Sequence, residues 1–134
     1  MINVAVLGYG TVGSGVVEVI NRNQESINKK AGEEINIKYV LDLRDFPGDP
    51  VQEKIVHDYE IILNDPEIGI VVEVMGGVEP ANTFVRKALE AGKSVVTSNK
   101  ALVAKHGSAL LKTAREKNVN FLFEASVGLS LIHI

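Results

Sequence analysis

The chain has 134 residues, a formal net charge of −3, 46% hydrophobic residues, 23% charged residues and no cysteine. This length suits one globular domain and is too short for two full ones, while the missing cysteines exclude disulfides, thiolate metal sites and cysteine nucleophiles. The net charge and the lack of a Lys/Arg cluster argue against nucleic acid and membranes as partners, and without a signal peptide or an apolar run of ~20 residues we expect a cytoplasmic domain.

An apolar run over residues 2–7 leads into a Gly-x-Gly-x-x-Gly turn and then into a helical pattern that begins at about Thr11. This combination is typical of a dinucleotide-binding turn. Gly8 permits the tight turn out of the strand, Gly10 lets the backbone approach a pyrophosphate, and Gly13 lets the following helix pack closely. The free N–H groups and the positive dipole end of that helix would face the phosphates.

The helix is expected to run to about residues 24–28, and a loop over 28–34 leads to a strand over 35–41. Asp42 and Arg44 follow the end of this strand. An acid at this tip accepts hydrogen bonds from the adenine-ribose 2′-OH of NAD, whereas an arginine favours the 2′-phosphate of NADP. Because both residues are present, the sequence leaves NAD and NADP open, and ordinary loop charges are the alternative interpretation.

The next segment carries weaker patterns. Two prolines and a glycine predict a loop over 46–50, residues 51–57 fit either a short strand or a connection, and 58–63 predict a short helix. His57 is interpreted as a surface loop residue, because the sequence around it offers no second ligand for a metal.

Residues 68–75 form a nearly continuous apolar run, as expected for a parallel strand that is covered on both faces. The run ends at Gly76 and Gly77, which would leave room for a ligand, and a helical pattern follows that closes at Gly92. Glu73 within the run would be a buried acid, which needs a partner that the sequence does not identify.

The remaining patterns are a strand, a helix and a last strand, over residues 94–97, 101–114 and 120–123. Lys100 lies at the tip of the first of these strands, and Glu124 at the tip of the second. The helix is expected to be interrupted around residues 106–107 and to end near Asn118, a residue type that suits a left-handed C-terminal position.

Strands that alternate with helices predict an α/β fold of the Rossmann type, a doubly wound and mainly parallel sheet with helices on both faces. Ligands of such sheets bind beyond the carboxyl ends of the strands. The strand tips should therefore lie together and seat a dinucleotide with its nicotinamide end toward Lys100.

Four stretches follow one another along the chain: Gly-Tyr-Gly-Thr-Val-Gly, Val-Val-Glu-Val-Met-Gly-Gly, Lys-Ser-Val-Val-Thr-Ser-Asn-Lys-Ala-Leu and Phe-Glu-Ala-Ser-Val. In these stretches and in their order, the chain from Ile2 to about Gly128 resembles the nucleotide-binding part of homoserine dehydrogenase. It implies reversible hydride transfer between NAD(P)H and aspartate 4-semialdehyde, which gives L-homoserine for threonine, methionine and isoleucine biosynthesis.

The resemblance also suggests residue roles. Lys100 falls on an active-site lysine, which can donate a hydrogen bond or proton to the oxygen where negative charge develops; a surface lysine that opens a helix is the alternative. Glu124 and Val127 fall where the family can hold a monovalent cation such as sodium, although a carboxylate satisfied at a strand tip explains Glu124 equally well. Together with the strand tips, the expected cofactor-binding residues are Gly8, Gly10, Thr11, Val12, Gly13, Asp42, Arg44, Gly76, Gly77, Thr97 and Lys100.

The chain departs from the family's pattern after Gly128. We expect residues 1–128 to form an NAD(P)-binding domain and 129–134 an atypical tail, with the family's catalytic and dimerising segment absent. Sequencing the locus past the last codon tests this expectation. Aspartate 4-semialdehyde reduction and homodimerisation would then belong to the intact family member, and a stand-alone NAD(P)-binding module without catalysis is the alternative. Truncation should also leave an unpaired sheet edge near residues 121–123.

Overall fold

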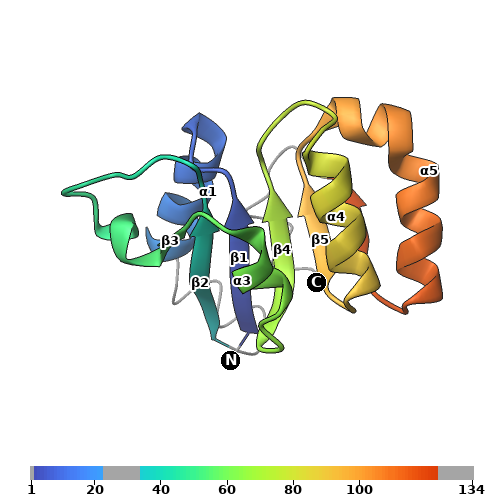
Figure 1. The fold of residues 1–134 in the computed structure, drawn as a ribbon, viewed down its shortest axis with the longest axis horizontal. Helices are drawn as coiled ribbons and strands as arrows, with labels where there is room; N and C mark the ends of the chain where they lie inside the picture. The colour runs from blue at the N-terminus through green and yellow to red at the C-terminus, as the bar shows by residue number, and fades with distance from the viewer. Residues whose placement is uncertain (1, 23–33, 124–134) are drawn as a thin grey trace.

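A computed structural model describes residues 2–22 and 34–123 of the chain. Within these residues, six parallel strands form one sheet in the order β3-β2-β1-β4-β5-β6, and helices connect them (Figure 1). The strands are β1 (Ile2–Leu7), β2 (Ile35–Leu41), β3 (Ile55–Val56), β4 (Ile68–Glu73), β5 (Ser94–Thr97) and β6 (Phe121–Phe123). The helices are α1 (Thr11–Arg22), the 3₁₀ helix η1 (Pro50–Lys54), α3 (Tyr59–Leu63), α4 (Ala81–Glu90) and α5 (Lys100–Glu116). This all-parallel sheet confirms the predicted Rossmann-type fold.

Helices cover both faces of the sheet, which explains why its central strands are apolar throughout. Along β1, Val4 and Val6 belong to the core cluster that includes residues of α1, whereas Ala5 and Leu7 belong to the cluster that includes residues of α3, α4 and α5. All four side chains are fully buried. The alternation follows from the two-residue period of a strand, which turns successive side chains to opposite faces.

The carboxyl ends of four strands lie level across the sheet. Leu7 of β1 is paired with Leu41 of β2 on one side and with Glu73 of β4 on the other. Glu73 is in turn paired with Thr97 of β5. The chain passes from β1 to β2 on one side and later returns to β4 on the other, so the strand order reverses at β1. Ligands of doubly wound sheets bind at such a reversal.

Three predicted boundaries differ in the structure. β4 ends at Glu73, two residues earlier than expected, and the ambiguous segment 51–57 forms most of η1 together with β3. The interruption expected around residues 106–107 was wrong, because α5 is continuous. A glycine costs a helix only about 1 kcal/mol, and the buried residues Leu102 and Leu110 hold α5 against the core on both sides of it. The predicted end of the helix is confirmed, since Asn118 has φ 57°.

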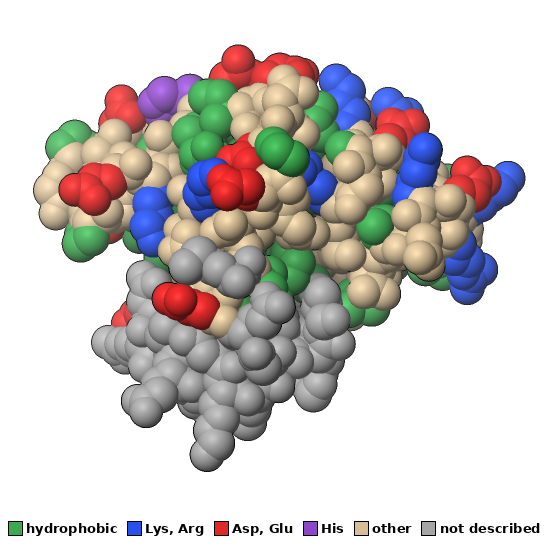
Figure 2. Space-filling model, turned by 90° about the horizontal axis from the view of Figure 1, so that it is seen from below, with side chains coloured by type: hydrophobic (Ala, Val, Ile, Leu, Met, Phe, Trp, Pro, Cys, Tyr) green, Lys and Arg blue, Asp and Glu red, His purple; other side chains and the backbone are tan. Residues whose placement is uncertain are grey.

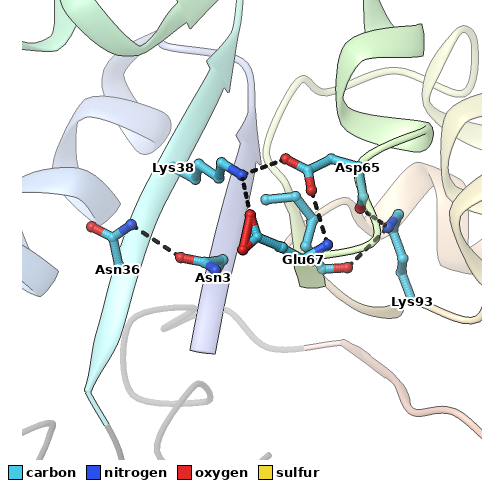
Figure 3. A network of polar contacts seen from close by, with 7 residues as sticks. Asn3, Asn36, Lys38, Asp65, Glu67 and Lys93 are labelled. Carbon is cyan, nitrogen blue, oxygen red and sulfur yellow. Dashed lines mark hydrogen bonds and ion pairs between the residues drawn. The ribbon is translucent and has the colours of Figure 1, made fainter. Parts of the chain in front are cut away.

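The amino edge of the sheet, opposite the strand tips, is closed by polar side chains (Figure 3). The ammonium of Lys38 lies 2.6 Å from an Asp65 carboxylate oxygen and 3.0 Å from one of Glu67. Lys93, which is only 4% exposed, donates to the carbonyl oxygens of Asp65 and Ile68 at 2.7 and 2.9 Å, and burial lowers its pKa. Acidic and basic side chains lie next to one another on this side of the molecule (Figure 2). Both ammonium groups bind residues 65–68, so they fix the turn that leads into β4.

Among the described residues, β6 is the last strand on its side of the sheet. Its residues Leu122 and Phe123 are 37% and 41% exposed, and Leu111 of the neighbouring α5 is also exposed. An apolar edge strand of this kind pairs readily with another chain. The unpaired edge expected near residues 121–123 stays a prediction, because residues 124–134 lie outside the described part of the chain.

Candidate dinucleotide site

The glycine turn after β1 has the tight geometry that the sequence predicts. Gly8 has φ +102°, which side chains disfavour, and its N–H donates to the Leu41 carbonyl at 2.8 Å. A Cβ at Gly13 would lie 2.0 Å from the Gly8 carbonyl oxygen, so only glycine lets α1 pack against the turn this closely. A Cβ at Gly10 would meet no other heavy atom of the described residues within 4 Å, which leaves the space before the helix open.

Thr11 and Val12 are the first two residues of α1. Their backbone N–H groups are at the N-terminus of the helix, where no carbonyl of a preceding turn can accept from them. Their side chains lie outside the part of the chain that can be described. An anion placed before Thr11 would meet these N–H groups and the positive end of the helix dipole.

A cavity of about 550 Å³ opens beside the turn, at the carboxyl ends of β1, β2 and β4. Its size is that of a small-molecule site, and such sites are mostly apolar with a few polar groups. Asp42, Arg44 and His57 supply charged or titratable side chains. The apolar side chains in the lining are Leu41, Leu43, Val74, Met75, Pro80 and Phe84, with the ring of Tyr59.

Tyr59 and Phe84 were not predicted as site residues. Tyr59 of α3 donates its hydroxyl to the Phe84 carbonyl of α4 at 2.6 Å, and the two rings stack at 4.3 Å. Burial raises the pKa of Tyr59, which keeps its hydroxyl a donor. Leu43, also unpredicted, is 88% exposed at the rim. No sequence pattern indicated that Leu43, Tyr59 and Phe84 line one cavity, because they belong to separate elements.

The Asp42 carboxylate at the tip of β2 is fully engaged within the protein. One oxygen accepts the Tyr9 N–H at 3.0 Å, and both accept from the Arg44 guanidinium at 3.0 Å. The Arg44 hydrogen bonds hold the pKa of the Asp42 carboxyl well below its ordinary value. The carboxylate is only 10% exposed and the arginine 62%. Asp42 and Arg44, the two residues expected to determine the preference for NAD or NADP, thus form one ion pair.

His57 is a half-exposed surface residue, as predicted, but it also organises this tip. Its Nδ1 lies 2.7 Å from the Asp42 carbonyl oxygen and its Nε2 lies 2.9 Å from an Asp45 carboxylate oxygen. The hydrogen bond to the Asp42 carbonyl, together with the Asp45 charge, raises the pKa of His57. A protonated ring donates to both oxygens and joins the two ends of the loop.

At the tip of β4, Glu73 is completely buried and has found the partners that the sequence did not identify. One carboxylate oxygen accepts the Met75 N–H at 2.8 Å, and the other accepts the Thr97 hydroxyl at 2.7 Å. The Thr97 oxygen accepts the Asn99 N–H at 3.0 Å. Thr97 was expected to bind the cofactor, but its side chain is fully buried and engaged, so it has no surface for direct contact.

Lys100 is the first residue of α5 and is exposed, next to Asn99, which caps the helix. Gly76 and Gly77 both have positive φ, 78° and 74°, in the loop after β4. None of these three residues lines the cavity described above, which lies nearer β2. The expected residues therefore spread along one edge of the sheet, from Asp42 past the glycine turn to Lys100.

The cation ligands expected at Glu124 and Val127 lie outside the described residues. Within residues 2–22 and 34–123, no group of three or more His, Cys, Asp or Glu side chains could hold a metal ion. In the same part of the chain, no helix combines the length and apolar character needed to cross a membrane.

Comparison with known proteins agrees with this geometry. The family model "Homoserine dehydrogenase, NAD binding domain" matches residues 8–124. Homoserine dehydrogenase of Lactococcus lactis is 44% identical over 133 residues, covering 95% of this chain and 31% of that protein. The crystal structure of a homoserine dehydrogenase from Thiobacillus denitrificans superposes with a TM-score of 0.87 at 40% identity, covering 93% of this chain and 30% of that one.

A further solved structure is that of a hyperthermophilic archaeal homoserine dehydrogenase in complex with NADPH. It matches with a TM-score of 0.75 at 26% identity, and the match covers 93% of this chain and 44% of that one. The present chain spans about 30% of the length of the curated relatives that it matches. On the match of residues 8–124 alone, the chain belongs to the NAD-binding domain family of homoserine dehydrogenase.

Proposed function

We propose that this chain binds NAD(H) or NADP(H) along the carboxyl edge of its sheet, as the cofactor half of a homoserine dehydrogenase. The observation that carries the proposal is the turn at Gly8–Gly13, where the helix N-terminus approaches so closely that a Cβ at Gly13 would lie 2.0 Å from the Gly8 carbonyl oxygen. This places free N–H groups beside the reversal of the strand order, where a pyrophosphate would bind.

The adenosine end would lie in the cavity at the tip of β2. Leu43, Tyr59 and Phe84 offer apolar surface for a base, and Asp42 with Arg44 lies where the ribose 2′ position would come. Arg44 neutralises Asp42, so a 2′-phosphate would not face a bare carboxylate. If Arg44 turns toward solvent, Asp42 becomes free to accept a 2′-OH. We therefore expect dissociation constants for NADH and NADPH that differ by less than about tenfold.

The nicotinamide end would lie toward Lys100. When bound, the cofactor supplies the hydride. In the intact enzyme, the Lys100 ammonium would donate a hydrogen bond to the substrate oxygen on which charge develops, and the substrates would be aspartate 4-semialdehyde and L-homoserine. A monovalent cation near Glu124 and Val127, a homodimeric assembly and a cytoplasmic location belong to the same proposal.

The competing function is that of a module that binds NAD(P) without serving catalysis. Both functions predict cofactor binding by these 134 residues alone, without homoserine oxidation. They differ once the remainder of a family member is supplied, because only the cofactor half of an enzyme would restore turnover, with Lys100 required. Restored turnover that is unchanged by Lys100→Met would contradict the role of Lys100.

The direct test is a calorimetric titration of the chain with NADH and NADPH. Binding of both with similar affinity supports the proposal, and a Gly13→Val variant should bind neither. Absence of binding at millimolar cofactor by a cooperatively folded chain would overturn the proposed function. A preference above about a hundredfold for one cofactor would overturn only the account of Asp42 and Arg44.

A further inference from the structure

The buried carboxylate of Glu73 lies beneath the strand tips and contacts no solvent. Its two oxygens bind two different segments: the Met75 N–H at 2.8 Å in the loop after β4, and the Thr97 hydroxyl at 2.7 Å at the end of β5. Among the described residues, no buried side-chain nitrogen or oxygen is left without a hydrogen bond, so this cluster is complete.

The cluster continues to the start of α5. The Thr97 oxygen accepts the Asn99 N–H at 3.0 Å, which leaves its own proton for Glu73. The Asn99 side chain donates to the Gly77 carbonyl and accepts the Leu102 N–H at 3.1 Å, which caps the helix that begins at Lys100. A chain of hydrogen bonds thus joins Glu73 to the first turn of α5.

The same cluster fixes the loop after β4 from two directions. Glu73 accepts the N–H of Met75, a residue that also lines the cavity, and the Asn99 side chain donates to the Gly77 carbonyl. Gly76 and Gly77 have positive φ, so without these anchors the loop would have many alternatives of similar energy. Of the anchored residues only Met75 lines the cavity proposed for the adenosine end, and none of the anchoring hydrogen bonds includes Asp42, Arg44 or His57.

We propose that Glu73 is a positioning residue for the nicotinamide half of the cofactor. Through Met75, Thr97 and Asn99 it holds the loop at residues 75–77 and the Lys100 end of α5 in one arrangement, while the adenosine half, which would meet only Met75 of these residues, depends on it less. This inference rests on the proposed function, because it assumes that a dinucleotide lies along this edge.

The test compares two ligands that differ only in the nicotinamide: NADH and ADP-ribose. In the isosteric variant Glu73→Gln, one of the two acceptor oxygens is replaced by an NH₂ group, which can only donate and therefore faces either the Met75 N–H or the Thr97 hydroxyl. We expect NADH to bind about tenfold more weakly and ADP-ribose to keep its affinity within about twofold. Thr97→Val, which removes only the hydroxyl link, should show the same separation. Both ligands are titrated calorimetrically into variants whose cooperative unfolding has been verified.

Matched controls are Glu90→Gln, at an exposed position of α4, and Thr113→Val, whose hydroxyl bonds only within α5 among the described contacts. Both should bind both ligands as the unchanged chain does. Equal weakening of NADH and ADP-ribose in Glu73→Gln and Thr97→Val would show a general structural role and overturn the inference, as would full retention of NADH binding. If Glu73→Gln fails to fold, Thr97→Val decides alone. If the unchanged chain binds neither ligand, the proposed function itself fails.

Discussion

Two carboxylates lie on either side of the central strand β1, and each accepts a backbone N–H from a loop at the carboxyl edge of the sheet. Asp42, after β2, accepts the N–H of Tyr9 in the turn beside it, and Glu73, at the end of β4, accepts the N–H of Met75 in the next loop. Their second partners differ. Asp42 is paired with a guanidinium that is 62% exposed, whereas Glu73 is bonded to a hydroxyl that is fully buried.

This difference in partners predicts different roles, ligand binding for Asp42 and anchoring of the loop for Glu73. A carboxylate whose partner is an exposed arginine can exchange it for a ligand, because water solvates the guanidinium that is released. A buried carboxylate cannot exchange partners without leaving polar groups unsatisfied, so it holds one arrangement. We therefore expect substitutions at Asp42 to change ligand choice and substitutions at Glu73 to change the shape of the site and the stability of the fold.

The largest expected effect is that of Glu73→Leu on stability. The change leaves the half-buried Met75 N–H and the buried Thr97 hydroxyl without an acceptor, so the free energy of unfolding should fall by about 2–4 kcal/mol. Asp42→Asn keeps an acceptor for Tyr9 and loses an ion pair whose guanidinium is largely exposed, so the fall in its free energy of unfolding should be the smaller of the two, about 1 kcal/mol. Urea denaturation measures both, with Glu90→Leu as the surface control. Equal falls in the free energy of unfolding for Glu73→Leu and Asp42→Asn would contradict the difference in role between the two carboxylates.

Gly13 lies between the two sites and should affect both. The Cβ of Gly13→Ala must displace the Gly8 carbonyl, which should cost about 1–3 kcal/mol of unfolding free energy and weaken NADH and ADP-ribose alike. Gly15→Ala in the same helix is the control, because a Cβ there meets no described heavy atom within 4 Å and alanine favours a helix by about 1 kcal/mol. Calorimetric titration and urea denaturation follow the two properties. A Gly13→Ala variant as stable as Gly15→Ala would contradict the close packing.

A smaller and more selective effect is expected for Arg44→Leu. Removing the guanidinium leaves Asp42 free to repel a 2′-phosphate, so NADPH should bind about tenfold more weakly while NADH binds as well or better. The ratio of the two dissociation constants is the measurement. Asp42→Asn should move this ratio the other way, toward NADPH. A ratio unchanged in both variants would show that the pair has no part in cofactor choice.

The smallest effect concerns pH. The pKa of His57 is raised above 6.5 by its hydrogen bond to the Asp42 carbonyl and by Asp45. Because the folded state binds the His57 proton more tightly than the unfolded state, the protonated ring stabilises the fold. This contribution is complete below pH 6.5 and is lost as the pH rises through the pKa of the folded state. His57→Ala should therefore show a flatter decline of unfolding free energy above pH 6.5. NMR titration of the imidazole should give a lower pKa in Asp45→Asn, and an unchanged value would exclude a contribution from Asp45.

The sequence predicted those parts of the molecule that depend on local pattern. The glycine turn, the strand tips and the layered sheet all follow from spacing within about a dozen residues. Glu73 was recognised as a buried acid, but its partner Thr97 lies 24 residues away and becomes adjacent only through the register of β4 and β5. The same limit hid Tyr59 and Phe84. The pairing of Asp42 with Arg44 is local, but it depends on the side-chain conformation of Arg44, which a residue pattern does not specify. The continuous α5 shows tertiary packing overriding the weak helix preference of glycine.

The course of β1 has a practical consequence for binding measurements. The strand begins at Ile2, at the amino edge of the sheet, and runs toward the opposite edge (Figure 1). At the usual rise of a strand, its six residues place the glycine turn about 20 Å away. A sensor surface, fluorophore or fusion partner attached ahead of Ile2 would therefore project from the side facing away from Asp42 and Lys100. The chain can be tethered by its amino end with the strand tips left open to ligand.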